Sequence, residues 1–200
     1  PTFNVAVPFI DRHVSDGRGQ SVALRHADGE VTYAELAENV GRAGNVLLDL
    51  GIKAGERIVI AAVDDPMFFY VFWGAIKAGI VPVAVSTFLK EDEYRFLLKD
   101  SECVAFVYSS TLAGETAAMK GTTPRLRVVF SVDGTNSLAE RMAAASPQLA
   151  PAPTTAMTDC FWLYSSGSTG NPKGVVHVHR DMVVTSERYG RRIAGLVAND

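Results

Sequence analysis

Residues 57–85 read RIVIAAVDDPMFFYVFWGAIKAGIVPVAV, and they carry the strongest fold signal in the chain. The apolar runs at the two ends of this segment, 57–63 and 80–85, have the length and the β-branched content of buried strands. The Asp-Asp-Pro at 64–66 is typical of a helix start, and the Ala-Gly pair at 78–79 is typical of a helix end. The segment therefore predicts one complete β-α-β crossover, the unit that joins parallel strands.

Strand-length apolar runs alternate with helix-period segments along the rest of the chain as well. A capping-box pattern at Thr32 and Glu35, for example, predicts the start of a helix that Gly51 ends. The other expected strands are at 22–25, 31–32, 104–108, 126–130, 161–164 and 175–178, and the expected helices are at 5–14, 36–50, 67–77, 91–98, 111–120, 137–145 and 182–191. We therefore expect an α/β fold, a doubly wound, mostly parallel sheet with flanking helices, in which ligands bind beyond the carboxyl ends of the strands.

Composition and charge narrow the class of protein. The chain has 200 residues, of which 48% are hydrophobic and 20% charged, as in a globular protein with a sizeable core. A net charge of -3 without a basic block predicts neither a nucleic-acid nor a membrane partner, and the most apolar run, 67–76, is too short to cross a bilayer. Cys103 and Cys160 lie far apart, so we expect two buried thiols and a reducing, cytoplasmic location.

A glycine-rich segment near the end of the chain carries the chemistry. Residues 146–159, which we interpret as a linker, lead to 163–179, which read LYSSGSTGNPKGVVHVH. Residues 165–174 are expected to form a loop between two strands, where glycine lets backbone N–H groups approach a ligand and hydroxyls add further donors. Lys173 supplies the positive charge that the polyphosphate of a nucleotide needs.

Two other interpretations of this segment are weaker. In the P-loop of nucleotide triphosphatases a glycine precedes the lysine and a helix follows, whereas here Pro172 precedes Lys173 and a strand follows. A flexible Gly/Ser linker without a ligand would be polar at both ends, whereas apolar strands flank this loop on both sides. We therefore expect a phosphate-binding loop.

The run YSSGSTGNPKG at 164–174 resembles the phosphate-binding signature of the adenylate-forming enzymes, the superfamily of acyl-CoA synthetases and adenylation domains. Two weaker family motifs occur in the expected order, VTYAEL at 31–36 and GAIKAGIVPV at 74–83. The flanking FWLYSS and HVHR sequences most resemble the benzoate-CoA ligase branch, as do four shorter motifs, DRH at 11–13, GRG at 17–19, EYRF at 93–96 and DS at 100–101. The resemblance covers nearly the whole chain, but only the glycine-rich loop is diagnostic of chemistry.

This resemblance implies a two-step reaction. A carboxylate, benzoate or a substituted benzoate, attacks the α-phosphate of ATP to give an acyl-adenylate and pyrophosphate, and the thiol of coenzyme A then displaces AMP to give a thioester. Mg²⁺ shares the phosphate charge, and a homodimer is an open alternative. The loop residues implied to bind the β- and γ-phosphates are Ser165, Ser166, Gly167, Ser168, Thr169, Gly170, Asn171, Pro172, Lys173 and Gly174, with Thr169 and Lys173 the first catalytic candidates.

The family's ligases are much longer than this chain. We therefore interpret residues 1–200 as the N-terminal portion of the AMP-binding domain, with the remainder of that domain and a small C-terminal domain absent, and expect the isolated portion to be inactive. Alternatives are adenylation of a fatty or amino acid, transfer to a carrier-protein thiol, or a nucleotide-binding module without turnover.

Three further features could suggest a metal or substrate site. His177 and His179 would share one face of a strand, but without a third ligand we expect no metal site there. The aromatic residues at 68–73 are expected to belong to the core, and the acidic pair at 64–65 to start a helix.

Overall fold

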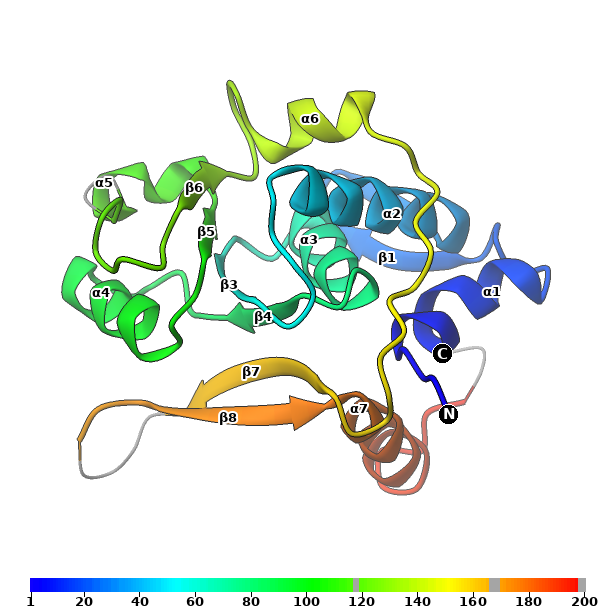
Figure 1. Ribbon diagram of the computed structural model, residues 1–200. Coiled ribbons are helices and arrows are strands. Elements are labelled where there is room, and N and C mark those ends of the chain that lie inside the picture. Colours follow the sequence, from blue (N-terminus) through cyan, green and yellow to red (C-terminus); the bar gives the residue numbers. More distant parts are fainter. Residues whose placement is uncertain (117–118, 166–169, 198–200) are drawn as a thin grey trace.

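The computed structural model describes residues 1–116, 119–165 and 170–197. Its centre is a six-stranded sheet in the order β6-β5-β3-β4-β7-β8, beside a two-stranded hairpin of β1 and β2 (Figure 1). The strands are β1 (Val22–His26), β2 (Gly29–Thr32), β3 (Arg57–Ala61), β4 (Val81–Ala84), β5 (Ala105–Tyr108), β6 (Val128–Ser131), β7 (Asp159–Ser165) and β8 (Lys173–Val178). The helices are α1 (Arg12–Ser15), α2 (Tyr33–Asp49), α3 (Pro66–Lys77), α4 (Glu91–Asp100), α5 (Ala113–Thr116), α6 (Leu138–Ala144) and α7 (His179–Thr185).

The order of the strands is that of a doubly wound sheet. Strand β3 pairs in parallel with β4 on one side and β5 on the other, and β5–β6 and β4–β7 are parallel as well, whereas β7–β8 is antiparallel. The chain thus moves from β3 to β4 and then returns past β3 to β5. Because crossovers are right-handed, the reversal places successive helices on opposite faces of the sheet. The predicted fold class is therefore confirmed.

Alternate residues of β3 pack into two different cores. Ile58 and Ile60 lie with α2, α3 and α6 on one face, and Val59 and Ala61 lie with α4 on the other. All four side chains have no exposed surface. Burial on both faces explains why this strand is a continuous apolar run rather than an alternating one.

The helix starts follow the capping chemistry of the sequence. The Thr32 hydroxyl accepts from the Glu35 N–H at 3.2 Å, and the Glu35 carboxylate accepts from the Thr32 N–H at 2.8 Å, so the predicted capping box is confirmed. Asp65 caps α3 by accepting from the N–H groups of Met67 and Phe68. The acidic pair at 64–65 thus starts a helix, and the aromatic residues of α3 pack against the core clusters, as expected.

Some boundaries differ from the expectation. The helix expected at 111–120 is α5 after a short 3-10 turn, and its described part ends at Thr116, since 117–118 lie outside the described residues. The strand expected from 126 begins at Val128. Helix α7 starts at His179 rather than 182. The Asp181 carboxylate accepts from the Val178 N–H at 3.0 Å, so Val178 is the N-cap residue and Asp181 lies within the first turn of the helix.

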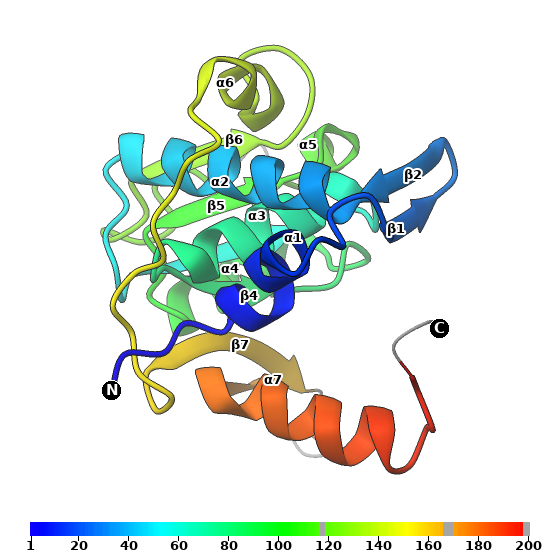
Figure 2. The same ribbon diagram turned by 90° about the vertical axis from the view of Figure 1, so that its right-hand side faces the viewer.

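The expectation of a linker at 146–159 is wrong. The amide of Asn45 on α2 donates to the backbone oxygens of Ser146 and Gln148, and the Ala152 N–H donates to Lys77 O at the end of α3. This strap descends from α6 past α2 to the N-terminal segment (Figures 1 and 2). Several of its backbone groups bond to distant parts of the chain, which local periodicity could not reveal.

Both cysteine side chains are buried, and we expect them to be unreactive in the folded protein. Burial raises the pKa of Cys103 to about 11 and that of Cys160 to about 12. At pH 8 the thiolate fraction is then on the order of a thousandth or less. Iodoacetamide at pH 8 should therefore add no carbamidomethyl group to the native protein within minutes, and two after unfolding in urea, as measured by intact mass. Rapid alkylation of native protein would contradict this burial.

Within the described residues, no helix combines the length and the hydropathy that a bilayer crossing demands.

Candidate functional site

The glycine-rich segment forms the end of the β7–β8 hairpin. Ser165 is the last residue of β7 and pairs with Lys173, the first residue of β8. Ser165, Lys173 and Gly174 are therefore strand residues, and the expectation that the whole of 165–174 is loop is corrected, because the ladder continues further than the apolar pattern indicated. Of the predicted site residues, Ser166, Gly167, Ser168 and Thr169 lie outside the described residues, whereas Ser165, Gly170, Asn171, Pro172, Lys173 and Gly174 are described.

Lys173 offers an uncompensated positive charge at the end of this hairpin. Its side chain is exposed, and it forms no ion pair or side-chain hydrogen bond with any residue that the structure describes. Ion pairs within the described residues involve mostly arginines, and Lys77, which pairs with Asp11 at 2.6 Å, is the lysine among them. Within this part of the chain Lys173 shares its unpaired state with other exposed lysines, such as Lys53, and differs from them in its position at the hairpin. An unpaired ammonium group beside a glycine-rich turn is suited to bind an anionic ligand.

Two glycines of the hairpin have backbone positions that a side chain would disturb. Gly170 has φ +152, which L residues rarely adopt. A Cβ on Gly174 would lie 3.2 Å from the ring of Trp162 and 3.3 Å from the ring of Tyr164, both on β7. The turn geometry and the close contact between β8 and these rings therefore both depend on glycine.

The hairpin end lies at the edge of the sheet where doubly wound folds bind ligands. Because β7 is parallel to β4, the loop follows the carboxyl end of β7 on the same edge as the carboxyl ends of β3 and β4. A cavity of about 260 Å³ opens at the ends of β3 and β4. Its lining includes Asp64, Phe68, Ser86 and Phe88, and the Phe88 side chain is 93% exposed. This edge combines apolar surface with the free charge of Lys173.

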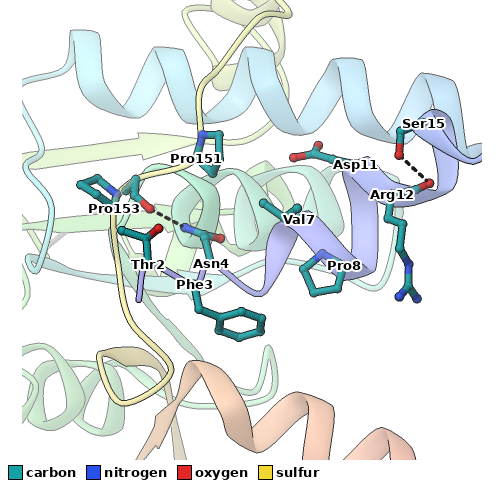
Figure 3. Close-up of a pocket in the computed structure, with 11 residues that line it drawn as sticks. Thr2, Phe3, Asn4, Val7, Pro8, Asp11, Arg12, Ser15, Pro151 and Pro153 are labelled. Carbon is teal, nitrogen blue, oxygen red and sulfur yellow. Dashed lines mark hydrogen bonds between the residues drawn. The ribbon is translucent and has the colours of Figure 1, made fainter.

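A larger cavity, of about 670 Å³, lies elsewhere (Figure 3). It is lined by the N-terminal segment, including Val7, Pro8 and Asp11, and by the strap residues 151–153. The Ala152 N–H is bonded to Lys77 O at the carboxyl end of α3, so this cavity is at the amino edge of the sheet. Its size does not make it the site, because it lies at the opposite edge of the sheet from Ser165 and Lys173.

The two histidines near the hairpin have separate structural roles. His177 stacks on Phe161 with ring centroids 4.6 Å apart, whereas His179 is 1% exposed and its Nδ1 accepts from the Val5 N–H at 3.1 Å. Burial lowers the pKa of His179, in keeping with its role as a neutral acceptor. They do not share a strand face, because α7 begins at His179. Groups of three or more His, Cys, Asp or Glu side chains suited to a metal do not occur in the described part of the chain.

One polar contact at the hairpin was missed by the sequence analysis. The Tyr164 hydroxyl donates to the Asp100 carboxylate at 2.6 Å. The two residues are 64 positions apart in the sequence. Each lies in a stretch that resembles the family, but no spacing pattern links the two stretches, so only the folded arrangement reveals the pair.

Known proteins resemble this chain over nearly its whole length. A protein-family model described as AMP-binding enzyme matches residues 11–196. Benzoate-CoA ligase of Thauera aromatica is 41% identical over 201 residues, which cover 99% of this chain and 38% of that protein. The 4-hydroxybenzoate-CoA/benzoate-CoA ligase of Rhodopseudomonas palustris is 40% identical over 195 residues, which cover 96% of this chain and 36% of that protein. The chain thus spans less than two fifths of the length of these relatives.

Solved structures share the architecture. A benzoate CoA ligase from Burkholderia xenovorans LB400 matches with a TM-score of 0.87 at 30% identity, over 98% of this chain and 38% of that one. The anthranilate CoA ligase AuaEII, crystallised in complex with anthranoyl-AMP, matches with a TM-score of 0.91 at 26% identity, again over 98% of this chain and 38% of that one. The arrangement of sheet and helices is therefore that of the corresponding part of these ligases.

Proposed function

Because the chain belongs to the AMP-binding enzyme family, we propose that residues 1–200 form the N-terminal portion of the AMP-binding domain of an aryl-CoA ligase. In this proposal the whole protein activates benzoate or a substituted benzoate with ATP and transfers the acyl group to coenzyme A. The relatives from Thauera aromatica and Rhodopseudomonas palustris, 41% and 40% identical, support the substrate class. The unpaired Lys173 at the carboxyl edge is the observation that supports the role of the loop.

The hairpin end would bind the β- and γ-phosphates of ATP while the carboxylate attacks the α-phosphate. Lys173 neutralises charge on the departing pyrophosphate, and the loop residues 165–174 supply backbone N–H and hydroxyl donors, with Thr169 among them. Nucleotidyl transfer chiefly requires such positioning and charge neutralisation from the protein. Mg²⁺ would share the phosphate charge, and no metal ligand is assigned to the described residues, which lack a suitable cluster.

The proposed function is tested by carboxylate-dependent exchange of labelled pyrophosphate into ATP by the full-length protein. We expect exchange with benzoate and hydroxybenzoates, and formation of the CoA thioester when coenzyme A is added. Octanoate and an amino acid such as phenylalanine serve as controls for the other carboxylate classes. Exchange with one of these controls alone would redirect the substrate assignment, and absence of exchange with every carboxylate would contradict adenylation itself.

A further inference from the structure

The outer end of the β7–β8 hairpin is no longer part of the parallel sheet. Strand β7 pairs with β4 at two positions only, Trp162 with Val83 and Leu163 with Ala84. Strand β8 is at the edge and pairs with β7 alone. From Tyr164 outward the hairpin has no ladder pairing with β4, although the Tyr164 ring still packs against the core cluster that contains Tyr94 and Leu98. This part carries the proposed phosphate-binding residues.

A hydrogen bond joins this outer end to α4. The Tyr164 hydroxyl donates to Oδ2 of Asp100, the last residue of α4, at 2.6 Å, and α4 lies on the side of the molecule toward which β7 runs (Figure 1). Within the described part of the chain, this is the side-chain hydrogen bond that links residues 164–165 and 170–174 to the rest of the molecule. Burial, and then the neighbouring Asp100 carboxylate, raise the pKa of Tyr164, so the phenol remains a donor at neutral pH.

The ring of Trp162, which lies two residues before Tyr164 on β7, also contacts the end of α4, through Arg57. The Arg57 guanidinium lies 5.0 Å from the centroid of Trp162, donates to the Ser101 carbonyl oxygen and forms an ion pair with Glu102 at 3.3 Å. Residues 100–102, at the end of α4, thus hold both rings of β7. Asp100 accepts directly from the Tyr164 hydroxyl, whereas Ser101 and Glu102 bind the Arg57 guanidinium that lies beside Trp162. Gly174 also lies close to both rings, because a Cβ on it would be 3.2 Å from the Trp162 ring and 3.3 Å from the Tyr164 ring, so the placement of the rings affects the start of β8.

We propose that Tyr164, held by Asp100, is a positioning residue for the phosphate-binding loop. This inference rests on the proposed function. The bond sets the direction in which Ser165 and Lys173, paired across the ladder, leave the sheet toward the carboxyl edge. A hairpin end whose strand residues Ser165 and Lys173 are pre-oriented in this way loses less freedom when ATP binds, and a small error in their placement weakens the contacts to the departing pyrophosphate.

Tyr164→Phe in the full-length protein tests the proposal, because it removes the hydroxyl and keeps the ring that packs on Gly174. We expect kcat/KM for ATP in the adenylation step to fall about tenfold, since a charge-assisted hydrogen bond is lost. Thioester formation from supplied acyl-adenylate should remain nearly unchanged, because pyrophosphate has left by then. Tyr33→Phe is the matched control, since the Tyr33 ring stacks on His13 and its hydroxyl makes no hydrogen bond within the described residues.

Two variants of the acceptor complete the test. Asp100→Ala should reproduce the Tyr164→Phe defect, and the double variant should show little further loss because both changes remove the same contact. Asp100→Asn keeps an oxygen acceptor and should retain most of the adenylation rate. Equal loss in both half-reactions, or additive losses in the double variant, would assign these residues to general stability and overturn the positioning role.

The outcomes separate this inference from the proposed function. If the wild-type protein exchanges pyrophosphate and Tyr164→Phe matches it, the positioning role fails and the ligase assignment stands. If the wild-type protein supports no exchange with any carboxylate, both fail together.

Discussion

Lys173→Ala in the full-length protein is expected to slow acyl-adenylate formation by about a hundredfold or more, the loss typical of removing one group that stabilises charge in a transition state. The Lys173 ammonium group is exposed at the start of β8 and has no ion-pair partner within the described residues, so no local carboxylate competes for it. Its charge is available to oxygens that become more negative as pyrophosphate departs. Thioester formation from supplied acyl-adenylate should be nearly unaffected, because that step involves no pyrophosphate.

The measurement compares pyrophosphate exchange with single-turnover thioester formation. Lys53→Ala is the matched control, because it removes the same charge from an exposed residue of the loop that precedes β3, at the opposite edge of the sheet. Lys173→Arg should recover only part of the adenylation rate that Lys173→Ala loses. A guanidinium keeps the positive charge but spreads it over a planar group whose N–H donors lie at other positions than those of an ammonium. Thr169→Ala should be milder than Lys173→Ala, because a hydroxyl contributes less than a charge. Equal losses in both half-reactions for Lys173→Ala would contradict the phosphate-binding role.

The central crossover could be predicted because its signals are local. The apolar run of β3 is buried on both faces, and Asp65 and Pro66 act within the first turn of α3. The helix start depends on neighbours along the chain, and a continuous apolar run indicates a strand buried on both faces by its residue types alone, so the sequence was sufficient for both. The same holds for the capping box at Thr32 and Glu35.

The features that the sequence did not predict depend on contacts between distant segments. Residues 146–159 have no periodicity, yet they are fixed by the side chain of Asn45 and the end of α3. At the candidate site, the residue types of the loop predict phosphate binding, which stays a prediction. The pairing of Ser165 with Lys173 and the bond from Tyr164 to Asp100 required the folded arrangement, because the strand register and the position of α4 determine them.

The contact between the strap and α2 predicts a large loss of stability for Gly41→Ala. A Cβ at Gly41 would lie 1.9 Å from the carbonyl oxygen of Pro147 and 2.8 Å from its carbonyl carbon, so backbone rather than a flexible side chain would have to move. Overpacking of this kind typically costs more than the roughly 0.5–1 kcal/mol that alanine gains over glycine within a helix. We therefore expect a net loss of about 2 kcal/mol in the free energy of unfolding.

Urea unfolding followed by circular dichroism measures this loss, with Gly114→Ala as the matched control. Gly114 is an exposed residue of α5, and a Cβ there would have no atom within 4 Å, so this variant should be as stable as the wild-type protein or slightly more stable. If Gly41→Ala and Gly114→Ala had the same stability, the strap would not lie against α2. The segment at 146–159 would then be the free linker that its composition suggested, and β7 would enter the sheet without the support of α2 and α3.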